Sequence, residues 1–207
     1  DVHLPLGDAV PLGDDLEVVD QRLHRGVELL ARRQHDLAVV GDPRLALHLL
    51  EPVDLGPLIE QIVSGWEQRR ETGTVRLAFA RPRRASTIVI GEPGRLARAI
   101  DNIIDNAISF SPADGLVEIA AIHVGDRILI RVDDEGPGVP DESREAIFNR
   151  FHSVRPATET FGRHSGLGLA IARAIVEGHD GEIDVADRDD APSGARFTIS
   201  LPAADDV

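Results

Sequence analysis

Hydrophobic residues near the start of the chain recur every three or four positions, which is the period of an amphipathic helix. This spacing predicts a helix over about 15–33 and a second helix over about 54–71, ended by Gly73. Residues 1–16 lack such a period and are rich in Pro and Gly, so we interpret them as irregular. Residues 41–52 are interpreted as a linker or a short extra element.

Beyond residue 74 the pattern changes to short strand-like runs that alternate with helices. In one run, Ile128, Ile130 and Val132 alternate with charged or outward positions, as in a half-buried sheet. Gly125 and Asp126 separate this run from the one before it, which predicts a hairpin. The predicted strands are 75–82, 86–92, 116–124, 126–136, 182–188 and 195–202, and the predicted helices are 91–111, with Pro93 near its start, a short one over 141–150, and 167–179.

The order of these elements predicts an α+β fold in which helices cover one face of a mixed, mostly antiparallel sheet. A helical segment precedes this layer. We divide the chain into residues 1–50, the helical segment and linker, and residues 51–207, the main domain.

Composition narrows the possible functions. The 207 residues are 42% hydrophobic and carry a net charge of −14, so we expect no nucleic-acid partner and no anionic lipid partner. The chain has no Cys, which excludes a disulfide framework, a Cys-ligated zinc and a thiol nucleophile. No apolar run approaches the roughly 18 residues that span a bilayer, so we expect no membrane segment in this piece. The chain begins with Asp and contains no Met, and we interpret it as part of a longer protein.

The predicted helix 91–111 carries two stripes. An apolar stripe should face the sheet, and Asn102, Asp105, Asn106 and Ser109 form a polar stripe at positions i, i+3, i+4 and i+7. One interpretation is a solvated face. The other is a binding face, because short oxygen-bearing side chains suit a hard cation such as Mg²⁺, which takes few protein ligands and completes its shell with phosphate and water.

Two glycine-bearing turns offer further chemistry. In "DDEGPGVP", Asp134 ends a strand beside Gly136 and Gly138, so its carboxylate could accept from an exocyclic amine, although hairpin ends are often rich in Asp and Gly. In "GRHSGLGL", glycines at 162, 166 and 168 open a helix, and such a helix start offers backbone N–H groups to a phosphate. The chain contains no Lys, so this is not a Walker A loop.

A polar segment without periodicity lies between the two turns. Phe148 and Phe151 flank Arg150 at its start, which is typical of a hinged lid with an apolar anchor. Arg150, Arg155 and Arg163 could meet phosphate charge when the lid is closed.

The ordered set of these motifs resembles the ATP-binding domain of sensor histidine kinases, within the wider GHKL ATPase superfamily, over about residues 53–202. "DNIIDNAISFSP" is similar to the N box, "DDEGPGVP" to the first glycine box, "FNRF" to the F box and "SGLGL" to the second glycine box. The resemblance implies a two-layer α/β sandwich that binds ATP and Mg²⁺ under a mobile lid and transfers the γ-phosphoryl group to a histidine.

The resemblance also implies roles for individual residues. Asn106 would bind Mg²⁺ and act in catalysis with Arg150, while Asp134 would bind the adenine amine. The other nucleotide contacts implied are Asn102, Ser109, Phe110, Gly136, Gly138, Ser165, Gly166, Leu167, Gly168, Leu169 and Thr198. Ser109 and Phe110 depart from the family, which often has Lys or Arg and then Tyr at these positions, so a positive charge is missing.

The phosphorylated histidine of this family lies on the first helix of a two-helix dimerisation hairpin, before an acidic residue and a Pro. Residues 18–33 resemble the second helix of that hairpin, and the pattern of the first is not visible. His3 and then His35 rank as candidates, whereas His24 and His48 lack such a context. We interpret His179 as structural, because a cation suits the end of a helix.

The leading hypothesis is therefore a cytoplasmic histidine kinase, or the cytoplasmic part of a membrane-bound sensor, with a response-regulator receiver domain as partner. A homodimer would form through the helical segment if that segment is complete. One alternative is a degenerate kinase that binds nucleotide or a regulator as a scaffold without autophosphorylation. Another is a GHKL serine kinase of the anti-sigma type or a GHKL ATPase, against which the hairpin-like helix argues.

Overall fold

The computed structural model describes residues 50–69, 75–81, 86–150 and 166–204. The predicted helix over 15–33 and the candidate histidines His3 and His35, together with His24 and His48, lie outside the described residues. The division of the chain at residue 50 stays a prediction.

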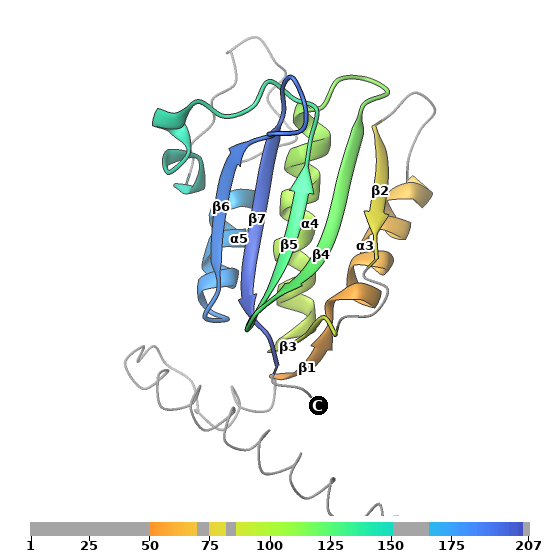
Figure 1. Ribbon diagram of the computed structural model, residues 1–207, viewed down its shortest axis with the longest axis vertical. Helices are drawn as coiled ribbons and strands as arrows, with labels where there is room; N and C mark the ends of the chain where they lie inside the picture. The colour runs from red at the N-terminus through yellow and green to blue at the C-terminus, as the bar shows by residue number, and fades with distance from the viewer. Residues whose placement is uncertain (1–49, 70–74, 82–85, 151–165, 205–207) are drawn as a thin grey trace, which may run out of the picture. The chain divides into compact units, whose positions relative to one another are not determined.

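A five-stranded sheet with the order β2-β4-β5-β7-β6 forms the main layer (Figure 1). Only the β2–β4 pair is parallel, and the other three pairs are antiparallel. The strands are β2 (Arg76–Ala80), β4 (Leu116–Val124), β5 (Arg127–Asp133), β6 (Glu182–Asp187) and β7 (Ala195–Pro202). The predicted mixed, mostly antiparallel sheet and the predicted hairpin of β4 and β5 are confirmed.

Three helices, α3 (Leu55–Arg69), α4 (Pro93–Phe110) and α5 (Gly168–Glu177), cover one face of this sheet (Figure 1). Alternate strand residues face them, and β7 shows this clearly, because Ala195, Phe197, Ile199 and Leu201 are buried while the residues between them are partly exposed. The result is the predicted α+β, two-layer sandwich with helices on one face. Within the described ranges, no helix is both long enough and apolar enough to cross a bilayer.

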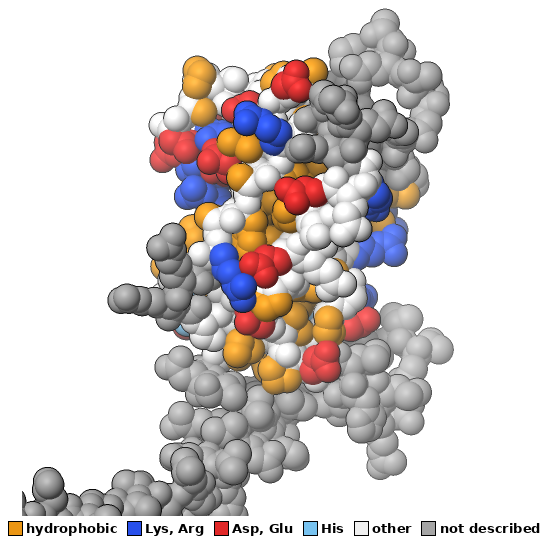
Figure 2. All heavy atoms as spheres, turned by 90° about the vertical axis from the view of Figure 1, so that its right-hand side faces the viewer, with side chains coloured by type: hydrophobic (Ala, Val, Ile, Leu, Met, Phe, Trp, Pro, Cys, Tyr) orange, Lys and Arg blue, Asp and Glu red, His pale blue; other side chains and the backbone are white. Residues whose placement is uncertain are grey.

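The start of α3 is held by a second, smaller sheet that the sequence did not reveal. β1 (Glu51–Asp54) pairs antiparallel with β3 (Ile88–Gly91), so β3 lies outside the main sheet. Asp54 caps α3: its Oδ1 accepts from Gly56 N at 3.0 Å and from the Thr87 hydroxyl at 2.6 Å. Figure 2 views the domain from the side of β2 and α3, where acidic, basic and hydrophobic side chains are interspersed.

The predicted short helix over 141–150 is wrong as an α-helix. The chain forms two 3₁₀ turns instead, η2 (Asp141–Ser143) and η3 (Ala146–Phe148). The second turn buries Ile147 and Phe148, and Phe148 meets the Phe197 ring edge-to-face at 6.3 Å. Two short turns suit a connection that must bring one apolar pair into the core without a continuous apolar stripe.

His179 joins the end of α5 to the start of α4, as a structural residue. Its ring is buried, Nδ1 lies 2.7 Å from the Ile175 carbonyl oxygen, and Nε2 accepts from Glu92 N at 3.1 Å. A ring nitrogen that accepts a backbone N–H carries no proton, so the ring is neutral with its proton on Nδ1. The prediction of a structural role therefore fits these contacts, but its reason, a cation at the helix end, is wrong.

Candidate functional site

The long helix α4 separates an apolar stripe from a polar one, as its sequence predicts. The apolar stripe is buried against the sheet and consists of Leu96, Ala99, Ile100, Ile103, Ile104 and Ala107. The polar stripe of Asn102, Asp105, Asn106 and Ser109 is half-buried. A face that only met water would be mostly exposed, so neighbouring segments lie over part of this stripe.

The neighbour of the first half of α4 is α5, which runs antiparallel to it. At one end His179, just after α5, binds Glu92, just before α4. At the other end Gly168, the first residue of α5, faces Asn102, because a Cβ built on Gly168 would lie 3.7 Å from Asn102 Oδ1. The part of α4 from its first residue to Asn102 and the whole of α5 are both about 14 Å long, at about 1.5 Å per residue. α5 therefore begins level with Asn102, and the last eight residues of α4 extend about 12 Å beyond it.

Asn102 carries an unmet hydrogen-bonding group at this level. Its Nδ2 atom is buried and has no hydrogen-bond partner among the described residues. A buried amide nitrogen without a partner costs about 1–3 kcal/mol, so such atoms call for an explanation. The side chain that carries this atom lies beside the first residue of α5, with Oδ1 as its nearest atom to Gly168.

The backbone at the start of α5 fits the approach of an anion. Gly166 has φ 66°, a conformation that favours glycine, and Leu167 precedes the first helical residue, Gly168. The first N–H groups of a helix have no partner within it and lie at the positive end of its dipole. Leu169 packs against the hydrophobic core, and Ser165 lies outside the described residues.

We call residues 103–110 of α4, which extend beyond the start of α5, the uncovered half of α4. Its far end meets the turn after β5. A Cβ on Gly136 would come within 2.9 Å of the Phe110 carbonyl oxygen, so only glycine allows this approach. Gly138 adopts φ 79°, a conformation that also favours glycine. Phe110, the last residue of α4, is 37% exposed at this point. The two glycines thus have a conformational reason, and the turn is held against the end of α4.

Asp134 is the buried carboxylate of this turn and is held by two backbone amides. Its Oδ1 accepts from Gly136 N at 2.8 Å and from Ala195 N at 3.0 Å. Burial raises the pKa of Asp134 above its ordinary value, while the bonds from Ala195 and Gly136 and the charge of Arg188 oppose that rise. The two bonds occupy Oδ1 and fix the orientation of the whole group, so that Oδ2 can serve a ligand with a hydrogen to donate.

Ala195 and Arg188 were not found from the sequence. Ala195 contributes through its backbone N–H, which leaves no sequence signal, and Arg188 is one of many arginines in this chain. The only available signal was the predicted last strand, whose first residue Ala195 pairs with Asp187 of β6 and accepts from Asp134 N at 2.9 Å. Two segments distant in the sequence, the turn after β5 and the start of α5, thus border the uncovered half of α4.

One predicted site residue, Thr198, lies apart from this group, and the role of another, Arg150, stays a prediction. Thr198 lies on β7 between the buried Phe197 and Ile199, so its side chain points to the face without helices, and its position does not support a contact with the nucleotide. Arg150 is exposed at the end of a described segment, just after η3. Phe151, Arg155 and Arg163 lie outside the described residues, as does the predicted lid.

The donor set fits a magnesium ion better than a transition metal. No group of three or more His, Cys, Asp or Glu residues that could hold a metal occurs in the part of the chain that the structure describes. Mg²⁺ does not require such a group, because it usually keeps several waters and takes one or two protein oxygens plus phosphate. The half-buried Asn106, one turn beyond the orphaned amide of Asn102, offers one such oxygen.

Comparisons with known proteins agree with this geometry. Residues 91–205 match the family described as "Histidine kinase-, DNA gyrase B-, and HSP90-like ATPase". The sensor protein ChvG of Agrobacterium fabrum is 38% identical over 173 residues, which are 79% of this chain and 29% of ChvG. The chain therefore spans less than a third of the length of this curated relative.

This chain also matches two solved structures over nearly the whole length of each. The mycobacterial sensor histidine kinase MprB is 31% identical with a TM-score of 0.62, over 74% of this chain and 97% of that one. The ATP binding domain of PrrB from Mycobacterium tuberculosis is 28% identical with a TM-score of 0.57, over 75% of this chain and 98% of that one. The family match covers more than half of the residues of this chain. The chain therefore belongs to the histidine kinase-, DNA gyrase B- and HSP90-like ATPases and contains their ATP-binding domain.

Proposed function

We propose that one ATP molecule binds along the uncovered half of α4. The adenine lies at the Asp134 turn, and the triphosphate lies between Asn106 and the start of α5. This proposal rests on one observation: two polar side chains suited to a ligand, Asp134 and Asn102, lie at opposite ends of the uncovered half of α4. Asp134 is fixed by two amides at one end, and at the other the Asn102 Nδ2 atom is buried without a hydrogen-bond partner among the described residues.

The residues at the adenine end suit an amine. The Asp134 carboxylate would accept a hydrogen bond from the exocyclic amine of adenine, and Gly136 and Gly138 would allow the ring to approach the backbone. The exposed ring of Phe110 lies at the same end of α4 and offers an apolar surface to the base.

The residues at the phosphate end suit an anion. The N–H groups at the start of α5, with Gly166, Leu167 and Gly168, would donate to phosphate oxygens. Asn102 would satisfy its amide on the same group, with Ser109 and Ser165 as further polar contacts. No cationic side chain stands on the polar stripe, so Arg150 is the described candidate to meet phosphate charge as a catalytic residue.

Mg²⁺ is the proposed metal, with Asn106 as its protein ligand. When bound, it would neutralise charge on the phosphates and support transfer of the terminal phosphoryl group. The chain's own contribution is to orient the triphosphate between α4 and α5, and to hold the adenine at a fixed distance from the reacting end.

For the whole protein we propose protein-histidine kinase activity in a two-component system. ATP would phosphorylate a histidine, and the phosphoryl group would pass to an aspartate of a response-regulator receiver domain. The sensor-kinase relatives support this. Residues 1–50 would belong to the dimerisation and phosphotransfer segment of a homodimer working in the cytoplasm, with His3 and His35 as candidates for the phosphoacceptor.

The test is incubation with γ-labelled ATP and Mg²⁺, alone and with a separately made histidine-hairpin domain. We expect label that is labile in acid and stable in base, as for phosphohistidine. Asn106→Ala should lose it, and Gln68→Ala, an exposed amide on α3, should keep it. Nucleotide binding without label would indicate a scaffold, acid-stable label would indicate transfer to Ser or Thr, and normal labelling of Asn106→Ala would contradict the metal role.

A further inference from the structure

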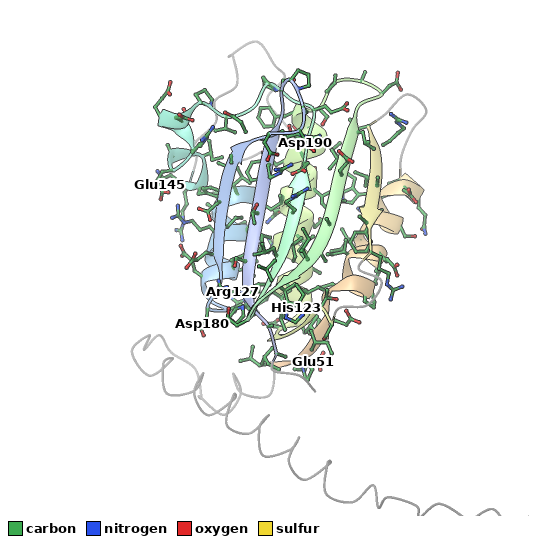
Figure 3. All side chains as sticks on the ribbon, in the orientation of Figure 1. Glu51, His123, Arg127, Glu145, Asp180 and Asp190 are labelled. Atoms are coloured by element: carbon green, nitrogen blue, oxygen red, sulfur yellow. The ribbon has the colours of Figure 1, made fainter. Side chains whose placement is uncertain are left out.

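Two arginines flank the connection between β6 and β7 and share one carboxylate. Nε and Nη2 of Arg188 bind the Asp190 oxygens at 3.2 and 3.3 Å, and Nη2 of Arg196 binds Asp190 Oδ1 at 3.0 Å. Arg196 also binds both oxygens of the buried Asp133, at 2.9 and 3.0 Å. Arg188 donates to Glu118 at 2.8 Å. We call Arg188, Asp190 and Arg196 the arginine cluster, and Figure 3 labels Asp190 at the upper end of the sheet.

The arginine cluster is joined to the main chain around Asp134. Nη1 of Arg188 donates to the Asp134 carbonyl oxygen at 3.4 Å, and the backbone N–H of Arg188 donates to Gly194 O at 3.3 Å. Gly194 has φ 122° and lies so close to Asp134 that a Cβ there would overlap the same carbonyl oxygen. The next residue, Ala195, donates one of the two hydrogen bonds that orient the Asp134 carboxylate. The β6–β7 connection, which contains Arg188 and Asp190, therefore leads directly into the residue that donates one of the two hydrogen bonds to Asp134.

The charge of Arg188 acts on the same carboxylate. Burial raises the pKa of Asp134, the charge of Asp133 adds to the rise, and the charge of Arg188 opposes it. Further charged groups stand on the segments around this carboxylate. They are Glu118, Glu135, Asp187, Asp189, Asp190, Arg144 and Arg196.

We propose that Arg188 is a positioning residue for the nucleotide. It holds the β6–β7 connection, and with it the Ala195 N–H, so that the Asp134 carboxylate stays oriented, and its positive charge favours the ionised carboxylate. This inference rests on the proposed function, because it gives Arg188 a role in binding the same adenine. Arg188 acts through Asp134 and does not touch the nucleotide itself.

The variant Arg188→Gln suits the test because it leaves no charge stranded in the interior. Its partners Glu118 and Asp190 have side chains that are 49% and 51% exposed, so water can replace the lost arginine. Removing Arg196 would instead take two hydrogen bonds from the buried Asp133, whose side chain is 4% exposed, and leave it the weaker 3.4 Å ion pair with Arg131, which is destabilising. Arg127→Gln is the matched control, because Arg127 binds Ser200 and Asp180 O at the opposite end of the sheet (Figure 3).

The experiment measures the affinity of the full chain for ADP as a function of pH, between about pH 5 and pH 8. The wild-type affinity should fall as the pH falls and Asp134 becomes protonated. Arg188→Gln should move the midpoint of this fall to higher pH and weaken binding at neutral pH about fivefold, as expected for contacting residues. Arg188→Lys keeps the charge and should bring the midpoint back towards the wild type, and Arg127→Gln should match the wild type.

An unchanged midpoint in Arg188→Gln would overturn the inference, even if its melting temperature were lower, because a merely structural role would lower stability alone. A midpoint displaced equally in Arg188→Lys would also overturn it. If Arg188→Gln does not fold, Arg188→Met keeps the apolar stem and takes its place. Failure of the wild type to bind ADP, or normal binding by Asp134→Asn, would contradict the proposed function instead.

Discussion

The substitution Asp134→Asn separates binding from folding, because it changes one end of a single side chain. Oδ1 of Asp134 accepts from the backbone of Gly136 and Ala195, and the amide oxygen of Asn can accept the same two bonds. The amide nitrogen then replaces Oδ2. In the proposed complex this nitrogen would point its hydrogens at the adenine amine, which also donates, so the contact would become unfavourable.

Asp134→Asn should weaken nucleotide binding without lowering the stability of the folded protein. A hydrogen bond to a charged group is worth about 1.5–3 kcal/mol, so its loss should weaken adenine binding about 10- to 150-fold. The folded protein should not be less stable at pH 7. Because burial raises the pKa of Asp134, the wild type loses stability as the pH rises through that pKa, and the neutral Asn lacks this loss.

Calorimetric titration with ADP and urea unfolding at pH 7 would measure both effects. The control is Asp184→Asn on the exposed side of β6, which should leave both quantities unchanged. Binding of ADP by Asp134→Asn within twofold of the wild type would refute the adenine role. A loss of binding that came with an equal loss of folded protein would refute the reasoning as well.

The remaining predictions concern the metal, the turn and the helix junction. Asn106→Ala should remove most of the gain in ATP affinity that Mg²⁺ provides, as measured by titration with and without the ion. An unchanged gain would argue against Asn106 as the metal ligand. Gly194→Ala should cost about 3 kcal/mol or more of unfolding free energy, because of its φ of 122° and the overlap with the Asp134 carbonyl. His179→Phe should cost about 2 kcal/mol in urea unfolding, because the Glu92 N–H loses its acceptor, and a cost near zero would refute the neutral-ring assignment.

The sequence predicted the helices and the main sheet because burial imposes a period on both. The stripe of α4 and the alternation of β5 each set one face against the core, and hydrophobicity reports that face directly. β1 was missed because its four residues, of which only Val53 is buried, show too little alternation. Residues 141–150 were predicted as a short helix, whereas the chain forms two 3₁₀ turns, of which the second buries one apolar pair.

Part of the site could be predicted from the types of its residues. Asn106 and Asp134 stand in motifs whose residue types reveal oxygen chemistry, and the glycines mark tight turns. The orientation of Asp134 could not be read, because it depends on the backbone N–H of Ala195, more than sixty residues later, and on the ion pairs of Arg188. Thr198 stands between Phe197 and Ile199 in an alternating strand, so the same period already placed it on the face away from the helices, and its prediction as a nucleotide contact did not use that period.

The most direct test of the central claim is a crystal structure of the domain with ADP and Mn²⁺, using the anomalous signal of manganese. We predict an adenine amine within hydrogen-bonding distance of Asp134 and a manganese peak bound to the side-chain oxygen of Asn106. A nucleotide bound elsewhere, or a metal held away from Asn106 while the adenine sits on Asp134, would contradict the claim that one nucleotide spans the uncovered half of α4.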